Sequence, residues 1–276
     1  MLEALSKQEP APLEVIVVDD ASSDATRTVA ERAGAHVVET GGRRFAGGAR
    51  NAGWAQARGE LVVFLDADVV PDRDWAAGLL RAAADFPGAL VGCARTFDAA
   101  TRWGWVAHLQ VETPFLPRGR VREISFLSSF CLVVPRDVQL RWDESYGGED
   151  ALFSAAASAA GLRLVFDPRF SARHAHERET FADLRRQQRR LAYGLARTIS
   201  LTHGARGLTR RFPVHYFLLL RLPVVFSRVA HDRRLRRRFL AVLPLLAVAE
   251  WTLGASAMRY ALQRPPLAGS GQPRFA

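Results

Sequence analysis

The sequence predicts an α/β protein in which a mostly parallel sheet is flanked by helices and a C-terminal helical region follows. Three observations predict this class. Short valine-rich runs alternate with helix-forming segments over the first 170 residues, which is the pattern of folds built on a parallel sheet. Two of these runs end in two aspartates each. Beyond residue 171 the pattern gives way to long stretches that mix arginine with apolar residues.

Strand and helix signals alternate from the start of the chain. The runs Glu14–Val18 and Leu61–Leu65 are short and apolar, which predicts buried strands. Ser22–Asp24 can cap the helix after the first run, and Gly34 can end that helix. The expected strands cover residues 14–18, 36–39, 61–65, 89–93, 122–135 (one strand or two) and 162–166, and the expected helices cover 25–33, 49–58, 75–84 and 149–160. A glycine-rich turn is expected at 41–48.

Charge is distributed unevenly along the 276 residues. Residues 1–170 carry 18 Lys and Arg against 23 Asp and Glu, a net charge of −5, and residues 171–276 carry 20 against 5, a net charge of +15. The first part therefore resembles an ordinary acidic globular domain, whereas the positive charge of the second part predicts an anionic partner. Because Lys7 is the only lysine, the arginine excess also fits a compositional bias, so it does not indicate nucleic-acid recognition by itself.

Two further features exclude classes of protein. The cysteines Cys93 and Cys131 lack the spacing of metal ligands, and two cysteines in a chain of this length do not predict a disulfide framework. The first ten residues show no charged-then-apolar pattern, so nothing marks the chain for secretion.

Acidic residues follow two of the predicted strands. Asp20 ends one run, and Asp66 and Asp68 end another. Ligands of a parallel α/β sheet bind beyond the carboxyl ends of its strands, so these side chains can meet in one crevice. Clustered carboxylates repel each other unless a cation offsets them, and oxygen ligands suit Mg²⁺ or Mn²⁺, which complete their shell with phosphate and water. The alternative is that such acids are loop residues and helix caps, as we expect for Asp24.

Three blocks of sequence carry a more specific signal. They are EVIVVDDASSDATRTVAERAG, GGARNAGWAQARGELVVFLDADVVPDRDW and YGGEDALFSAAASAAGLRLVFDP, and they cover about residues 13–175. In this order and spacing they resemble the family 2 glycosyltransferases with the GT-A fold. The resemblance implies a Rossmann-like catalytic domain at 1–175, shortened at its N-terminus. It also implies a metal-dependent enzyme that moves a sugar from a nucleotide diphosphate donor to an acceptor hydroxyl.

The resemblance implies roles for the matching positions. Asp150 would be the general base, with its neighbour Glu149 as the second candidate. Asp68 would bind the Mg²⁺ or Mn²⁺ that bridges the two phosphates, and His174 would contact the diphosphate or the metal. The alternative for His174 is a partly buried loop histidine. The donor would contact three further residues: Asp20 at the base of the nucleotide, Arg50 at the nucleotide or diphosphate, and Asp66 at the ribose or the metal's water shell.

The chemistry of sugar transfer agrees with those roles. The transition state resembles an oxocarbenium ion, and the leaving nucleoside diphosphate gains negative charge that a metal or cations must offset. One carboxylate then suffices to take the proton from the attacking hydroxyl, which means inversion at the anomeric carbon. Trp142, which precedes the GGED block, can stack on the C–H face of the acceptor sugar, or it can be a packed loop aromatic.

The sequence departs from the family in two places. Members usually begin with a strand of the type VSVVIPTYN ahead of VVDD, and here only residues 1–12 precede EVIVVDD, so we expect that first strand to be lacking. Its loss would expose a sheet edge beside the donor site. Processive members carry Q-x-x-R-W, which Gln188–Leu191 does not complete, so a processive polymer synthase is not expected.

The region 176–265 is basic and apolar, and 266–276 is expected to be a flexible tail. Three interpretations of the region compete. Basic amphipathic helices, one of them at Phe181–Leu201, can lie on an anionic membrane surface. Alternatively, Phe239–Leu262 is long enough to span a membrane, with Arg233–Arg238 on the cytoplasmic side, although Glu250 near its middle weighs against this. The third interpretation is a helical pair packed on the catalytic domain.

Either membrane interpretation predicts a location at the cytoplasmic face of the cell membrane, peripheral or with a single span. A glycan or lipid-linked acceptor at this membrane face would account for either interpretation. Two rival functions remain open: a nucleotidyltransferase on a related fold, and an inactive, truncated membrane scaffold or arginine-rich nucleic-acid binder. Asp66, Asp68 and Asp150 lie in the blocks that resemble the glycosyltransferases, which argues against a nucleic-acid binder. No nucleic-acid partner is therefore expected.

Overall fold

The computed structural model describes residues 1–175, 178–211 and 219–262, with the backbone alone for 203–211. The chain divides into two compact units, Met1–Thr96 with Pro117–His174, and Phe97–Leu116 with Ala175–Ala276. The mid-chain segment Phe97–Leu116 thus groups with the C-terminal part, whereas the sequence places it in the catalytic domain. The division at residues 175 and 265 stays a prediction, and the expected tail 266–276 lies outside the described residues.

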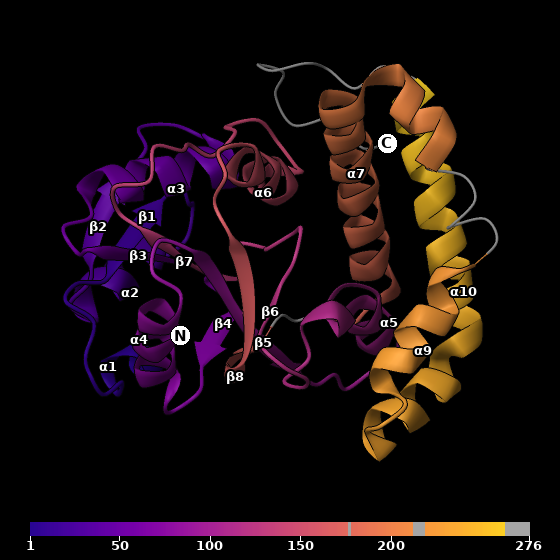
Figure 1. Ribbon diagram of the computed structural model, residues 1–276, viewed down its shortest axis with the longest axis horizontal. Helices are drawn as coiled ribbons and strands as arrows, with labels where there is room; N and C mark the ends of the chain where they lie inside the picture. The colour runs from indigo at the N-terminus through magenta and orange to yellow at the C-terminus, as the bar shows by residue number, and fades with distance from the viewer. Residues whose placement is uncertain (176–177, 212–218, 263–276) are drawn as a thin grey trace. The chain divides into compact units, whose positions relative to one another are not determined.

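The first unit alternates strands and helices as the sequence predicts (Figure 1). Its strands are β1 (Ile16–Asp19), β2 (His36–Glu39), β3 (Leu61–Leu65), β4 (Val69–Pro71), β5 (Leu90–Phe97), β6 (Arg122–Glu123), β7 (Cys131–Pro135) and β8 (Leu164–His174). Its helices are α1 (Leu2–Ser6), α2 (Thr26–Arg32), α3 (Phe45–Gln56), α4 (Trp75–Asp85) and α6 (Glu149–Ala159). The segment 122–135 contains two strands, one of the two outcomes that its sequence left open.

The larger sheet is mixed, and the expectation of a mostly parallel sheet is wrong. Its strand order is β3-β7-β5-β8-β4, with β6 paired to β8. Strand β7 runs antiparallel to both β3 and β5, and β4 and β6 run antiparallel to β8. Strands β1 and β2 form a separate parallel pair. The chain from β5 to β7 passes through α5, η1 and β6, and β7 then returns between β3 and β5 in the opposite direction.

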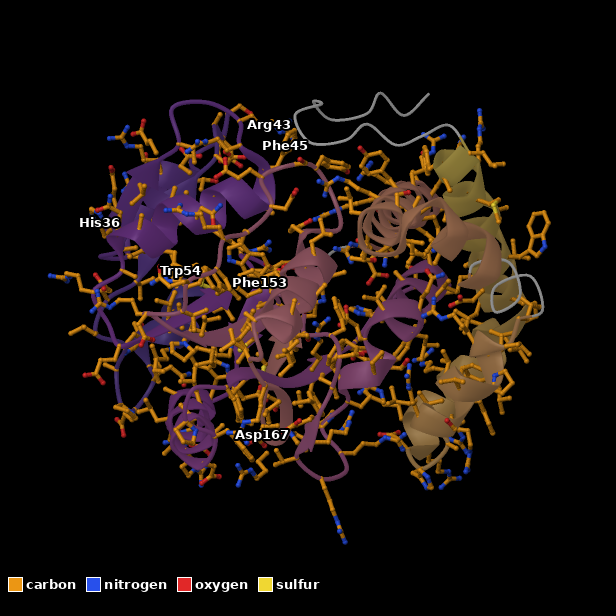
Figure 2. All side chains as sticks on the ribbon, turned by 45° about the horizontal axis from the view of Figure 1, so that its top comes forward. His36, Arg43, Phe45, Trp54, Phe153 and Asp167 are labelled. Carbon is orange, nitrogen blue, oxygen red and sulfur yellow. The ribbon has the colours of Figure 1, made fainter. Side chains whose placement is uncertain are left out.

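The larger sheet carries an apolar cluster on each face, because successive side chains of a strand point to opposite sides. Leu132 and Val134 of β7 belong to the cluster that contains Phe153 of α6. Trp54 of α3 packs against this cluster, with its ring centroid 6.2 Å from that of Phe153 (Figure 2). Cys131 and Val133 belong to the second cluster, with Trp75 and Leu79 of α4. The sheet is therefore covered by α3 and α6 on one face and by α4 on the other (Figure 1).

Helix α3 begins at Phe45, inside the segment where the sequence predicts a glycine-rich turn. A Cβ atom at Gly47 would lie only 1.8 Å from the carbonyl oxygen of Asp143. A Cβ atom at Gly48 would lie 3.4 Å from the Glu144 carboxylate. Gly47 and Gly48 therefore lie in the helix, whereas Gly41, with a φ angle of 70°, lies in the bend before it. The two helix glycines allow the segment that precedes α6 to approach the first turns of the helix closely.

The second unit consists of helices. They are α5 (Arg102–Val111), the 3₁₀ turn η1 (Thr113–Phe115), α7 (Phe181–Arg211), α9 (Arg221–Val229) and α10 (Arg233–Leu262). Trp105 and Leu109 of α5 share an apolar core with Leu184, Val225 and Leu246 of the later helices. This shared core explains why the mid-chain segment groups with the C-terminal helices. Helix α7 contains the amphipathic helix that the sequence predicts at 181–201 and extends beyond it.

Helix α10 is the one described helix that is long and apolar enough to cross a membrane, which by itself is weak evidence. It also packs inside its own unit. Phe239, Leu246 and Leu253 are buried, and so is Glu250, whose carboxylate lies 3.2 Å from the Arg221 guanidinium of α9. One face of the helix thus packs against other helices of the second unit.

Candidate active site

Arg50 of α3 is the centre of a charged cluster in the first unit. Its guanidinium nitrogens lie 2.9 Å from Asp66 Oδ1, 3.3 Å from Glu149 Oε1 and 3.8 Å from Asp150 Oδ1. The Arg50 side chain is only 14% exposed, and its guanidinium lies 4.8 Å from the Trp142 ring centroid. Five residues that the sequence singles out therefore meet here, although α6 follows α3 by almost a hundred residues.

Opposite charges stabilise this cluster. Burial alone would lower the pKa of Arg50. The negative charges of Asp66, Asp150 and Glu149 have the larger combined effect, so the pKa of Arg50 is raised. The guanidinium in turn holds three carboxylates that would otherwise repel one another. The arrangement gives the end of β3 and the start of α6 a fixed separation.

Asp150 has the properties of a base that works near neutral pH. Burial raises the pKa of its carboxyl group to about 6, with Glu149 and Asp66 adding to the rise and Arg50 opposing it. Its Oδ1 atom is buried and makes no hydrogen bond with the residues that the structure describes. Gly147 and Gly148 have φ angles of 76° and 85°, in the left-handed region that glycine adopts without strain. This pair turns the chain directly into α6 and places Asp150 in the first helical turn.

Asp68 and His174 form a second pair of predicted site residues. His174 Nε2 lies 3.3 Å from Asp68 Oδ2, and the His174 ring packs edge-on to Phe130. The pairing of β4 with β8 sets this distance, because Val69 is directly opposite His174 in the ladder. A carboxylate and an imidazole at this distance can serve as two ligands of one divalent cation, which leaves its other positions for phosphate and water.

Asp20 is held by a different set of contacts. Its Oδ1 atom accepts hydrogen bonds from Thr40 Oγ1 at 2.9 Å and from the Arg44 backbone N–H at 2.7 Å. The Arg44 guanidinium lies 3.5 Å from the Glu144 carboxylate. Asp20 therefore orders the turn that leads into α3, and it has no direct contact with Arg50 in the described structure.

Trp142 is 2% exposed, and its ring stacks on Phe153 with centroids 4.0 Å apart. This burial favours the packed loop aromatic over a free surface for an acceptor sugar. The residue that holds the Trp142 backbone is Asn51, which sequence reasoning missed. Asn51 Nδ2 donates to the Trp142 carbonyl and Asn51 Oδ1 accepts from the Trp142 N–H, both at 2.9 Å. The only signal was its place in the GGARNAG block, next to Arg50.

The ancestry of this site is settled by a match to a family model. Residues 1–139, half of the chain, match the model described as glycosyl transferase family 2. The chain belongs to glycosyl transferase family 2. The matched residues include Asp20, Arg50, Asp66 and Asp68 and end before Asp150, so the case for Asp150 rests on the geometry of the cluster.

A curated relative agrees with this family. The succinoglycan biosynthesis protein ExoO of Rhizobium meliloti (strain 1021) is 30% identical over 189 residues, which is 60% of this chain and 53% of the relative. The chain therefore spans about half the length of the curated relative that it matches.

Solved structures show the same GT-A fold. The mannosyltransferase PcManGT from Pyrobaculum calidifontis, in complex with GDP-Man and Mn²⁺, is 18% identical, with a TM-score of 0.63 over 95% of this chain and 81% of that one. S. aureus TarS 1–349, in complex with UDP-GlcNAc, is also 18% identical, with a TM-score of 0.53 over 95% of this chain and 86% of that one. At this identity the likeness shows the fold alone. This family 2 glycosyltransferase thus has the GT-A architecture that its sequence blocks predict, with a mixed sheet.

Proposed function

We propose that this glycosyltransferase moves a sugar from a nucleoside diphosphate donor to an acceptor hydroxyl, with inversion at the anomeric carbon. The observation that carries the proposal is the position of Asp150, whose carboxyl group has a pKa of about 6 and lies 3.8 Å from Arg50 in the same cluster as Asp66. A carboxylate with this pKa is ionised at neutral pH and still basic enough to accept a proton.

Asp150 would take the proton of the attacking hydroxyl. Glu149 is less suited to this role, because its side chain is 9% exposed against 27% for Asp150, and its Oε1 atom accepts a hydrogen bond from Arg50 at 3.3 Å. With one base and no second carboxylate acting as nucleophile, the new bond forms on the face opposite the leaving group, which inverts the anomeric centre.

Asp68 and His174 would hold a divalent cation, Mn²⁺ or Mg²⁺, that binds the donor diphosphate. When bound, such a cation offsets the negative charge that develops on the leaving diphosphate. The proposal is supported by the 3.3 Å separation of the two side chains and by the GDP-Man and Mn²⁺ in the related mannosyltransferase structure.

The remaining site residues would bind and order the donor side. Asp20 would bind the base of the nucleotide, and its hydrogen bonds to Thr40 and Arg44 keep its carboxylate oriented. Asp66 would contact the ribose or a water on the cation. Direct contact between Arg50 and the donor stays a prediction, because in this structure Arg50 holds three carboxylates.

The acceptor would be a glycan or a lipid-linked sugar of the cell envelope. Support comes from the name of the ExoO relative, a succinoglycan biosynthesis protein, and from the basic, apolar helices of the second unit. We place the enzyme at the cytoplasmic face of the membrane, bound as a peripheral protein. The ion pair of the buried Glu250 with Arg221 supports surface binding over a spanning α10, because that face of the helix packs against protein.

A screen of nucleotide sugars tests the transfer. The protein is incubated with each donor and Mn²⁺, with and without extracted envelope lipids, and the released nucleotide is identified. A nucleoside diphosphate as product supports glycosyl transfer, whereas pyrophosphate would indicate a nucleotidyltransferase. Asp150→Asn should abolish transfer and largely spare donor binding. Transfer at the normal rate by Asp150→Asn would refute the assignment of the base.

A further inference from the structure

The first two turns of α10 contain five arginines in six positions: Arg233, Arg234, Arg236, Arg237 and Arg238. This concentration of positive charge opposes folding in two ways. The N-terminus of a helix carries a partial positive charge, so cations there are unfavourable. Like charges four residues apart on a helix also repel each other. A cluster that is unfavourable for the fold itself indicates a function for the charge.

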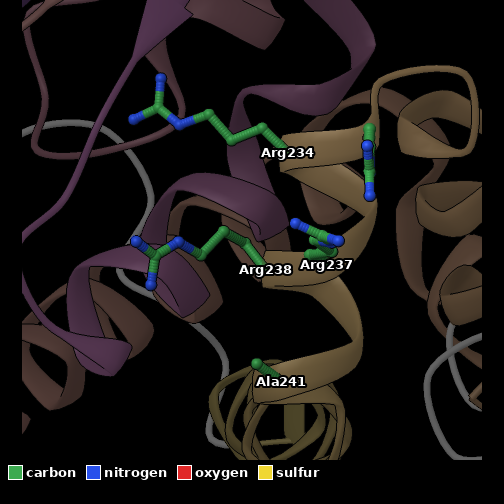
Figure 3. A pocket seen from close by; sticks show the side chains of 5 residues that line it. Arg234, Arg237, Arg238 and Ala241 are labelled. Carbon is green, nitrogen blue, oxygen red and sulfur yellow. The ribbon is translucent and has the colours of Figure 1, made fainter.

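Arg234 and Arg238 are held in place by neighbours in the same unit. Arg234 Nη2 lies 2.5 Å from the Asp98 carboxylate, and this hydrogen bond lowers the pKa of Asp98. The Arg234 and Arg238 guanidinium groups lie 5.7 Å and 5.2 Å from the Trp105 ring centroid. In Figure 3 the two side chains extend the same way from α10, one turn apart. The contacts with Asp98 and Trp105 thus organise one side of the cluster before any ligand binds.

Arg233 and Arg237 have no carboxylate partner among the residues that the structure describes. They lie one helical turn apart, and with Arg234, Arg238 and Ala241 they line a hollow of about 610 Å³ on the surface of α10 (Figure 3). The polar groups that line this hollow are guanidinium groups, and their planar forks bind phosphate oxygens in pairs. The charge of these groups therefore favours an anion, and a phosphate group matches both their charge and their hydrogen-bonding geometry.

An exposed apolar stripe continues from this cluster along α10. Leu240, Val248 and Trp251 are 55%, 62% and 51% exposed, and Pro244 is exposed between them. Their spacing places them on one face of the helix. The opposite face carries Leu246, Leu253 and other residues of the core. Helix α10 thus has an apolar outer face with a tryptophan, and arginines lie beside it. This pattern is typical of a helix that lies in a membrane interface.

We propose that this arginine cluster binds the phosphate groups of anionic lipids, with α10 lying along the membrane and Leu240, Val248 and Trp251 inserted among the headgroups. The proposal rests on the peripheral membrane location proposed above and not on the transfer chemistry. An anionic bilayer meets both observations, whereas a soluble phosphate would leave the apolar stripe in water.

Flotation of the full chain with vesicles tests this inference. The vesicles consist of phosphatidylcholine alone or of phosphatidylcholine with phosphatidylglycerol. We expect binding to the anionic vesicles, and a fall of roughly 30-fold in the partition coefficient for the double variant Arg233→Gln/Arg237→Gln, at about fivefold per basic residue near the surface. The matched control Arg32→Gln/Arg81→Gln removes two exposed charges from α2 and α4 of the first unit and should change the partition coefficient by about threefold or less.

Equal binding to neutral vesicles, no binding to anionic vesicles, or unchanged binding by the Arg233/Arg237 double variant would each overturn the proposal. Trp251→Ser should also weaken binding, and no effect there would overturn the placement of α10 in the interface.

Displacement from the vesicles by millimolar inorganic pyrophosphate, beyond the effect of sodium sulfate at the same ionic strength, would indicate a soluble phosphate ligand instead. Nucleotide release without vesicles should be the same in the double variant and the wild type. A failure of glycosyl transfer would leave the flotation result unaffected.

Discussion

Asn51 and Trp142 exchange two hydrogen bonds across 91 residues of sequence, from the Asn51 amide to the Trp142 carbonyl and from the Trp142 N–H back to the Asn51 oxygen. The Asn51 amide also donates to Glu144 at 3.0 Å. One buried side chain thus fixes the path of the segment that leads into α6 and Asp150. Because Arg50 is its neighbour in α3, the same helical turn positions both the segment and the charged cluster.

Asn51→Ala should weaken both stability and catalysis. It leaves the buried backbone groups of Trp142 without partners, which predicts a loss of about 1–3 kcal/mol in the free energy of unfolding. A displaced Asp150 should lower kcat by roughly 10- to 100-fold with a smaller effect on donor affinity. Urea unfolding and steady-state kinetics measure the two effects. Gln56→Ala removes an exposed amide from the same helix and should change neither.

Gly47→Ala should be costly although alanine favours helices. The new methyl group would lie 1.8 Å from the Asp143 carbonyl oxygen, so the loop must move. We expect a loss of about 1–3 kcal/mol in the free energy of unfolding and a kcat lowered in parallel. Gly42→Ala is the matched control, because no atom lies within 4 Å of a Cβ at that position, and it should change stability by about 1 kcal/mol or less. If both variants were equally stable, the close approach of α3 and the loop would be refuted.

The pH profile should report Asp150. A general base must be ionised, so kcat/KM of the wild type should rise with pH through about 6, the pKa of this carboxyl group, and reach a plateau above it. An Asp150→Glu variant with residual activity should shift the midpoint. A profile that is flat between pH 5 and 8 would contradict the assignment.

The same carboxyl group should couple stability to pH. Its pKa is raised from 3.8 to about 6 in the folded state, so its favourable contribution is fully present below pH 3.8 and is lost as pH rises through 6. Asp150→Asn should therefore raise the free energy of unfolding relative to wild type more at pH 8 than at pH 4, by about 1–3 kcal/mol. Asp24→Asn is a control that should show little difference between these two pH values, because hydrogen bonds from Thr26 lower the pKa of that exposed carboxyl group, so its contribution is lost only as pH falls below about 3.8. Urea unfolding at the two pH values measures both differences.

Removal of the cation ligands should weaken donor binding more than it disturbs the fold. Asp68→Ala and His174→Ala should each lower the affinity for Mn²⁺ in the presence of a nucleoside diphosphate by at least about tenfold. Isothermal titration calorimetry measures this. Asp74→Ala removes an exposed acid that makes no side-chain cap at the start of α4 and should have no effect.

Activity lost on treatment with EDTA should return with Mn²⁺. Full activity in EDTA would refute metal dependence.

The sequence alone determined the strand–helix alternation of the first unit and the positions of its acids. The runs IVVD and LVVFL form β1 and β3, and Asp20, Asp66 and Asp68 follow them as predicted. These features depend on local hydrophobic period and turn chemistry, which are visible in short stretches. The GGED block likewise places Asp150 in the first turn of α6.

Only the tertiary structure decided which of these residues meet. The antiparallel direction of β7 between β3 and β5 makes the sheet mixed. The contact of Arg50 with Glu149 joins residues 99 positions apart, and the start of α3 at Phe45 depends on a distant segment that packs against Gly47. Such long-range contacts arise from how whole elements pack. A local pattern in the sequence therefore does not by itself determine which of these side chains are in contact.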